Sequence, residues 1–165
     1  MAQRFGWGHV NINVQNLEAS IEFYRKLGFE TFIDGIPYLH LTAAKPVSIQ
    51  AGSAMALAIP EGTGARACIM QLDDGFPKID LTEITGLEQR APLENKDRGL
   101  VRICLMSQDL AKDYEELSAA GIPFLSPPQR CQDRMADIAT CVDPDGTLIE
   151  LLQVYLDKWP PIPGG

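Results

Sequence analysis

The beginning of the chain shows an alternating pattern of apolar and polar positions, followed by a helical pattern. Along residues 7–15 the apolar and polar side chains alternate, which is the period of a half-buried strand. Asn16 then offers a helix N-cap, and the apolar residues after it recur at helical spacing until Gly28. Residues 29–33 return to a strand-like pattern. We therefore predict a strand, a helix and a second strand over this stretch.

The same succession returns after residue 100. Residues 100–106 are strand-like, Asp109 can cap a helix, and Gly121 ends the helical spacing. A shift of 93 residues superposes the caps, the apolar positions and the terminators without a gap. Six pairs match at this shift: Asn16 with Asp109, Leu17 with Leu110, Ile21 with Tyr114, Tyr24 with Leu117, Gly28 with Gly121, and Phe29 with Ile122. Six matches at one shift favour an internal repeat over two unrelated strand–helix units.

Each half is predicted to end in a strand that carries one acid. Residues 79–84 parallel residues 146–151, and this alignment pairs Glu83 with Glu150 at a shift of 67 residues. Because 67 is 26 smaller than 93, the first half is expected to hold 26 extra residues within 34–66. We interpret this Pro- and Gly-containing segment as an elaborated hairpin or flap over whatever the core binds.

These patterns divide the chain into two modules. The inserted segment contains two short strand-like runs, residues 47–50 and 54–59. Residues 86–99 are polar and lack a period, which is typical of a linker. The expected organisation is a first module at 1–85 with its insertion within 34–66, the linker at 86–99, a second module at 100–154, and a Pro/Gly-rich tail at 155–165.

The turn and strand near the end of the chain contain an acid in an apolar setting. Residues 143–146 read Asp-Pro-Asp-Gly, a strong turn signal because Pro fixes φ and Gly accepts positive φ. Glu150 interrupts the apolar run that follows. Burying a carboxylate is costly unless it meets a cation, a proton or a metal, although alternation also allows Glu150 to face solvent.

Composition narrows the choice of partners and location. The chain has 165 residues, 45% of them hydrophobic, enough for one domain or two small modules sharing a core. Its formal net charge of −8 argues against nucleic acid or an anionic membrane as a partner, since both need basic patches. No apolar run approaches the ~20 residues that span a bilayer, and no signal-peptide core begins the chain. We expect a cytoplasmic protein with four free thiols: Cys68, Cys104, Cys131 and Cys141.

Two stretches resemble a known superfamily: HVNINVQNLEASIEFYRKLGFE at 9–30 and DPDGTLIELLQ at 143–153. With the repeat and the paired acids, they resemble the vicinal oxygen chelate (VOC) superfamily, which includes glyoxalase I, methylmalonyl-CoA epimerase, extradiol dioxygenases and bleomycin-resistance proteins. The resemblance covers nearly the whole chain. It implies an α+β fold in which two βαβββ modules form a U-shaped mixed sheet around a central site.

In glyoxalase-like members, four strand positions hold a divalent metal. The resemblance matches His9, Glu83 and Glu150 to three of them and places Arg102 at the second histidine position. One imidazole and two carboxylates suit Zn, Ni, Mn, Co or Fe. A guanidinium does not ligate a metal. Two arrangements stay open: Arg102 pairs with the acids in a metal-free site, or it turns to the rim and binds an anionic ligand group while a metal remains.

The resemblance implies two main classes of function. The first is a lyase or an isomerase/epimerase that acts on a small oxygenated substrate through an enolate, with Glu83 or Glu150 as base and His9 as ligand or polarising group. A dioxygenase is less expected, because it needs two histidines and an acid. The second is a metal-free small-molecule binding protein for resistance or sequestration. A blander alternative is an accessory subunit whose cavity is unused.

Further contacts are expected around the same site. Tyr38 and His40 lie in the inserted segment and are candidate substrate contacts. Cys104, two residues after Arg102, shares its face of the predicted strand and can line the cavity. The partner is expected to be a small-molecule ligand, and the chain is expected to form a homodimer, because the sheet edges are available to a second copy.

Overall fold

The computed structural model describes residues 4–86 and 90–160. It divides into two compact units, Met1–Arg90 and Ala91–Gly165, and the division falls inside the predicted linker. Parts of the predicted linker and tail, residues 87–89 and 161–165, lie outside the described residues. Among the described residues, no helix is both long enough and apolar enough to cross a membrane.

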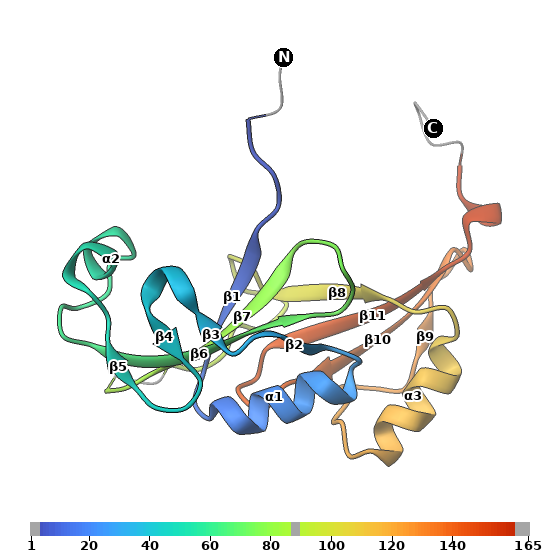
Figure 1. Cartoon of the computed structure of the whole chain (residues 1–165). Helices are drawn as coiled ribbons and strands as arrows, with labels where there is room; N and C mark the ends of the chain where they lie inside the picture. The colour runs from blue at the N-terminus through green and yellow to red at the C-terminus, as the bar shows by residue number, and fades with distance from the viewer. Residues whose placement is uncertain (1–3, 87–89, 161–165) are drawn as a thin grey trace. The chain divides into compact units, whose positions relative to one another are not determined.

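The first unit is a mixed sheet with one long helix (Figure 1). The strand order is β1-β7-β6-β2, and β5 also pairs with β6. The β1–β7 pair is parallel, whereas β6 pairs antiparallel with β7, β2 and β5. Its main elements are β1 (His9–Val14), α1 (Leu17–Lys26), β2 (Glu30–Ile33), β6 (Gly64–Gln71) and β7 (Lys78–Ile84).

The inserted segment contains five short elements. They are β3 (Gly35–Ile36), the 3₁₀ helix η1 (Pro37–Leu39), β4 (Leu41–Thr42), β5 (Val47–Ser48) and α2 (Ala51–Ala56). The antiparallel β3–β4 pair and β5 agree with the expected hairpin. The strand expected at 54–59 is wrong, because α2 occupies its beginning. Alanine is the strongest helix former, and the helix buries Ala54 against the sheet.

The second unit repeats this topology with fewer elements. Its strand order is β8-β11-β10-β9, with a parallel β8–β11 pair and antiparallel β11–β10 and β10–β9 pairs. Its elements are β8 (Arg102–Met106), α3 (Leu110–Ala119), β9 (Gln129–Arg130), β10 (Ala136–Val142), β11 (Leu148–Val154) and the 3₁₀ helix η2 (Leu156–Lys158).

The two long helices begin at the predicted caps. The Asn16 side chain accepts a hydrogen bond from the Ala19 N–H at 2.9 Å, and Asp109 accepts one from the Lys112 N–H at 3.1 Å. Each cap satisfies a backbone donor that the first helical turn leaves free. The shift of 93 residues between the helices is thus confirmed.

Each sheet has two distinct faces. In the first unit, α1 packs on one face, where Leu17 and Leu81 are fully buried. The opposite face, here called the His9 face, carries His9, Asn11, Asn13, Lys78, Asp80 and Thr82. The inserted segment packs on this side of β6, through a core cluster of Ile36, Leu41, Ile49, Ala54, Ala65, Ala67 and Ile69.

In the second unit, the strand register separates the side chains in the same way. Ile149 and Cys141 are fully buried on the face covered by α3. The opposite face, here called the Arg102 face, carries Arg102, Cys104, Met106, Leu148, Glu150 and Leu152.

Candidate functional site

The register of the final strands corrects the expected pairing of the acids. The Leu17 N–H donates to Glu83 at 2.8 Å, and the equivalent Leu110 N–H donates to Gln153 at 2.9 Å. Gln153 is therefore the counterpart of Glu83, at a shift of 70 residues rather than 67. His9 lies opposite Lys78 and Arg102 lies opposite Leu148, which gives the same shift.

The counterpart of Glu150 is therefore Asp80. In the strand register Asp80 lies opposite Asn11, and Glu150 lies opposite Cys104, the residue 93 positions after Asn11. The sequence held a signal for this pairing, because Ile79-Asp80-Leu81 and Ile149-Glu150-Leu151 are both an acid between apolar residues. The first unit accordingly has 23 rather than 26 extra residues between its helix and its last strand.

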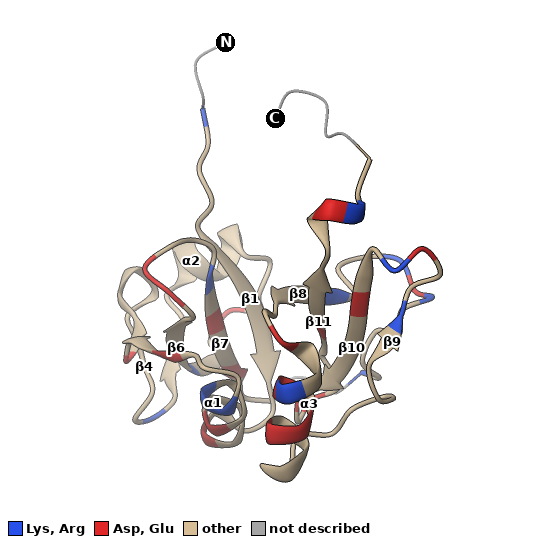
Figure 2. Ribbon diagram, turned by 90° about the vertical axis from the view of Figure 1, so that its right-hand side faces the viewer, with Lys and Arg blue, Asp and Glu red and all other residues tan. Residues whose placement is uncertain are grey.

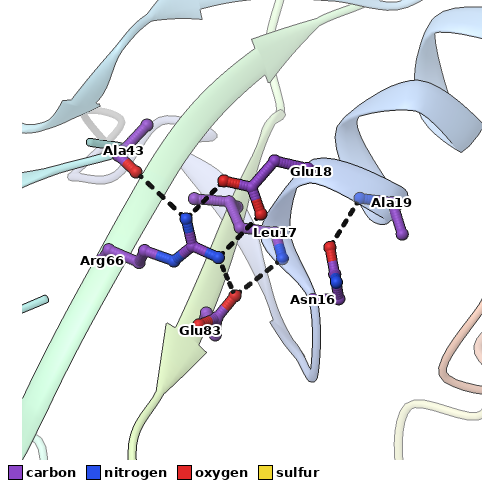
Figure 3. A network of polar contacts seen from close by, with 7 residues as sticks. All are labelled: Asn16, Leu17, Glu18, Ala19, Ala43, Arg66 and Glu83. Atoms are coloured by element: carbon purple, nitrogen blue, oxygen red, sulfur yellow. Dashed lines mark hydrogen bonds and ion pairs between the residues drawn. The ribbon is translucent and has the colours of Figure 1, made fainter. Parts of the chain in front are cut away.

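Glu83 lies beside Leu17 on the face of the sheet that α1 covers (Figure 3). The strand register places His9 on the opposite face. It accepts hydrogen bonds from the Leu17 N–H at 2.8 Å and from Arg66 at 2.6 Å. Arg66 also donates to Glu18 and, at 3.4 Å, to the Ala43 carbonyl. The Arg66 guanidinium lowers the pKa of Glu83 and of Glu18, and both carboxylates raise the pKa of Arg66. The expectation that Glu83 shares a site with His9 is therefore wrong.

Asp80 takes the place beside His9 that was expected for Glu83. β7 carries charged residues of both signs (Figure 2), and of these Lys78 and Asp80 are buried, the Asp80 side chain being 1% exposed. Oδ2 of Asp80 lies 3.5 Å from Nε2 of His9, whose side chain is 43% exposed. Among the described residues, neither oxygen of Asp80 has a hydrogen-bond partner of ordinary geometry. Burial raises the pKa of Asp80, and the charge of His9 and the nearby Tyr38 phenol oppose this shift.

Tyr38 reaches the same pair from η1. Its ring centroid lies 6.5 Å from that of His9, with 26° between the planes. Burial, and then the charge of Asp80, raise the pKa of the Tyr38 phenol. His40, the other expected residue of the inserted segment, is exposed at the end of η1 with φ 55°, and among the described contacts none joins it to His9 or Asp80.

A polar row extends this group along β1. Thr82 donates to Asn11 at 2.8 Å, and Asn11 donates to Asn13 at 3.0 Å. Sequence reasoning placed the asparagines on the polar side of the strand but gave them no role. The first unit therefore presents an acid–imidazole pair, a phenol and an amide row on one face.

The second unit brings Arg102 and Glu150 together, which agrees with the expected metal-free arrangement for Glu150 but not for Glu83, whose cationic partner is Arg66. Nε of Arg102 donates to Glu150, and Nη1 donates to Asn95 at 2.9 Å. Cys104 lies opposite Glu150 in the strand register. Burial, and then the charge of Glu150, raise the pKa of the Cys104 thiol, so it stays protonated and weakly nucleophilic.

Among the described residues, neither unit by itself supplies the donor set of a resident divalent metal held by three or four side chains. Within neither unit do the described residues gather three His, Cys, Asp or Glu side chains that could hold a metal ion. His9 and Asp80 supply two donors, Glu83 faces α1, and Arg102 already neutralises Glu150. We derive no chemical step through a metal from these residues.

Comparison with known proteins shows the family. The family model of the Glyoxalase/Bleomycin resistance protein/Dioxygenase superfamily matches residues 6–151 of this sequence, and the chain therefore belongs to this superfamily. The α+β fold with mixed sheets is the glyoxalase-like fold. No curated protein matches the chain.

Several solved structures share this fold. A glyoxalase family protein from Bacillus cereus has a TM-score of 0.70 at 16% identity, with 93% of this chain and 98% of that chain covered. A glyoxylase/bleomycin resistance protein/dioxygenase domain from Frankia sp. EAN1pec has a TM-score of 0.62 at 18% identity, covering 93% and 94%. The trypanothione-dependent glyoxalase I of Leishmania major has a TM-score of 0.55 at 19% identity, covering 88% and 84%.

Proposed function

We propose that the chain is an isomerase or lyase that moves a proton at a carbon next to a carbonyl group of a small substrate. His9 is the proposed base, and Asp80 is its positioning residue. The observation that carries this proposal is the buried Asp80 carboxylate, which has no hydrogen bond of ordinary geometry among the described residues and lies 3.5 Å from the half-exposed His9 imidazole. Such a carboxylate is costly to bury, and functional sites are where this cost is commonly retained.

The difference in exposure assigns the roles. The oxygens of Asp80 are buried, so a substrate reaches His9 and not the carboxylate. Nε2 of His9 faces Asp80, which leaves Nδ1 for the substrate. A carboxylate behind a histidine orients the ring and stabilises the imidazolium once a proton has been accepted.

The proposed reaction balances without an additional reactant. The substrate C–H bond breaks, the proton moves to Nδ1 of His9, and the electron pair delocalises onto the neighbouring carbonyl oxygen as an enolate. Return of the proton from His9 to another position completes an isomerisation. In a lyase reaction the enolate re-forms the carbonyl, the bond from the β-carbon to the leaving group breaks, and that group departs with the electron pair and takes the proton from His9.

The two glutamates first considered as bases are less suitable. Glu83 faces α1, and Arg66 lowers its pKa, which weakens it as a base. Glu150 is bound by Arg102. These contacts support a transfer of the base role to His9.

Solvent deuterium exchange tests this proposal. The purified protein would be incubated in D₂O with a panel of small ketones, hydroxyketones and keto acids, and loss of the proton signal beside each carbonyl would be followed by NMR. We expect His9→Gln to slow exchange by roughly 10²- to 10⁴-fold. Asp80→Asn should also change the pH profile of the exchange rate, a change that a purely structural role would not produce.

His40→Gln is the matched control, because it removes the chain's other histidine, which lies in the inserted segment and does not contact the His9–Asp80 pair among the described contacts. It should leave exchange unchanged. Equal losses in His9→Gln and His40→Gln, or no exchange above buffer with any compound, would refute the enzymatic proposal.

A metal-free binding protein is the second candidate. The contacts of Arg102 with Glu150 and Asn95 favour it, because they neutralise the acid of the last strand. Among the described residues these contacts use Nε and Nη1 of Arg102, and Nη2 can donate to a ligand. Saturable binding of panel compounds without any deuterium exchange would support this candidate. The homodimer and the cytoplasmic location stay predictions, and light scattering on the purified protein tests the first of them.

A further inference from the structure

The exposed aromatic side chains are concentrated beside His9. Six aromatic side chains of the described residues are exposed, and four of them border one end of the His9 face. Here they are called the aromatic rim: Trp7, Phe32, Tyr38 and Phe76, with exposures between 46% and 77%. An exposed group of large apolar side chains on a folded domain commonly marks a binding surface.

Contacts place three members of the rim around two neighbouring residues. Tyr38 lies against His9, with near-parallel ring planes. The rings of Phe32 and Phe76 lie 4.8 Å and 5.0 Å from Nζ of Lys78. Lys78 lies directly opposite His9 in the parallel β1–β7 pair. The three rings, from η1, β2 and the turn before β7, therefore gather at one end of the face.

Strand alternation adds Trp7. The Lys78 N–H donates to the Gly8 carbonyl at 3.0 Å, so the pairing of the chain with β7 continues one residue before β1. Alternation along this extended backbone places Trp7 on the side of the sheet where His9 lies. The indole is 77% exposed, so its area is available to a ligand.

The geometry of these rings indicates the shape of the ligand. The centroid distance of 6.5 Å between His9 and Tyr38 is near the upper end of the range for aromatic pairs, so the two rings are not packed tightly on one another. A planar aromatic ring can lay its whole face on such rings, whereas a puckered saturated ring meets them only through C–H groups. The ammonium group of Lys78 lies over one face of the Phe32 ring and one face of the Phe76 ring, and it holds both rings in place.

We propose that the ligand of the His9 face carries a planar aromatic ring next to its carbonyl group, and that Trp7 and Tyr38 are the residues that select this ring. The inference deepens the proposed function and rests on it for the carbonyl. It adds a specificity that neither the family nor the acid–imidazole pair assigns.

Acetophenone and cyclohexyl methyl ketone form a matched pair of probes. Both carry the same acetyl group, and they differ in whether the ring is planar. The saturated ring is the more apolar, so hydrophobic burial alone would favour cyclohexyl methyl ketone. Stacking is expected to reverse this order and to make acetophenone bind roughly threefold to tenfold more tightly.

Ligand-observed NMR titration measures the two dissociation constants, and the acetyl signal in D₂O reports proton exchange in the same sample. Trp7→Ala and Tyr38→Ala should abolish the preference for acetophenone, and Tyr38→Phe should retain it because the ring remains. Trp159→Ala removes the other tryptophan of the chain, in the second unit, and should leave the preference unchanged.

The outcomes separate the two proposals. Preferential binding of acetophenone, with no exchange of it or of any compound of the panel, supports the ring selectivity and contradicts the enzymatic function. Exchange of both ketones without a preference overturns the ring selectivity and leaves the enzymatic function standing. Absence of binding to either ketone, or a preference that survives in Trp7→Ala and Tyr38→Ala, overturns the inference.

Discussion

The contacts of Glu83 predict a structural role that mutation can separate from a catalytic one. Glu83→Ala removes the acceptor for the Leu17 N–H at the start of α1 and one carboxylate partner of Arg66. Glu83→Gln removes the negative charge but keeps an oxygen that can accept from Leu17, as Gln153 does for Leu110 in the second unit. The two variants thus separate the cap from the ion pair.

The size of the effect follows from the number of contacts and their burial. A hydrogen bond to a charged group contributes ~1.5–3 kcal/mol net. The side chains of Arg66 and Glu83 are only 16% and 17% exposed, so their pairing is weakly screened by solvent, and in Glu83→Ala Arg66 keeps the more exposed Glu18. We expect destabilisation of about 2–4 kcal/mol for Glu83→Ala and about 1–2 kcal/mol for Glu83→Gln. Gln153→Ala, which removes a neutral cap and the hydrogen bond from Nε2 of Gln153 to the Gln108 carbonyl, should cost about 1–2 kcal/mol.

Urea denaturation of the four proteins, followed by circular dichroism, measures these differences. The effect of Glu83→Gln should also depend on pH. Because Arg66 lowers the pKa of Glu83, its ionised form contributes stability above the usual glutamate pKa of 4.5, and this stability is lost as the pH falls through the lowered value. The wild-type advantage over Glu83→Gln should therefore shrink in acid.

A different pair of results would refute this reasoning. If Glu83→Ala unfolds at the same urea concentration as wild type but loses deuterium exchange or ligand binding, Glu83 acts in the site and not as a helix cap. If Glu83→Gln is as destabilising as Glu83→Ala, the ion pair with Arg66 accounts for the whole effect and the cap contributes nothing.

Three further predictions follow from the charged and thiol groups. Because burial raises the pKa of Asp80, wild type should lose stability relative to Asp80→Asn as the pH rises through the raised value. Equal urea midpoints of the two proteins at every pH from acidic to neutral would contradict this. Arg102→His should bind Zn²⁺ at least roughly tenfold more tightly than wild type in calorimetry, because an imidazole can ligate the metal and Glu150 is released from its ion pair. Arg130→His is the control, and an unchanged affinity of Arg102→His would show that Arg102 does not occupy a ligand position. Cys104 is exposed, yet iodoacetamide should alkylate it more slowly at neutral pH than a thiol of ordinary pKa, since partial desolvation and the charge of Glu150 raise its pKa. Rapid labelling in peptide mass spectrometry would contradict this.

Local sequence patterns predicted those parts of the fold that neighbouring residues determine. Asn16 and Asp109 were identifiable as caps because a short polar side chain before a helical apolar pattern has one favourable use. The first and last strands of each unit were identifiable from alternation and from the turn signals beside them. The inserted helix α2 was missed, because six residues are too few to show a helical period.

The face on which each acid lies depended on strand register. Aligning Glu83 with Glu150 by residue type gave an error of three positions, and an odd shift moves a side chain to the other face of a sheet. One error in alignment therefore exchanged the acid beside His9 with the acid that caps α1. The apolar neighbours shared by Asp80 and Glu150 were a better guide than the identity of the acid.

The sequence alone determined the repeat, the helix caps, the family and the positions of His9, Arg102 and Glu150 within their strands, because each of these follows from local spacing or from a recognisable motif. Tertiary structure decided which groups meet. Arg66 contacts Glu18 across 48 residues, and His9 meets Asp80 and Tyr38 from three separate elements. Such contacts depend on which strands pair and in what register, and that choice is made by burial of the whole apolar face and not by any short stretch of the chain.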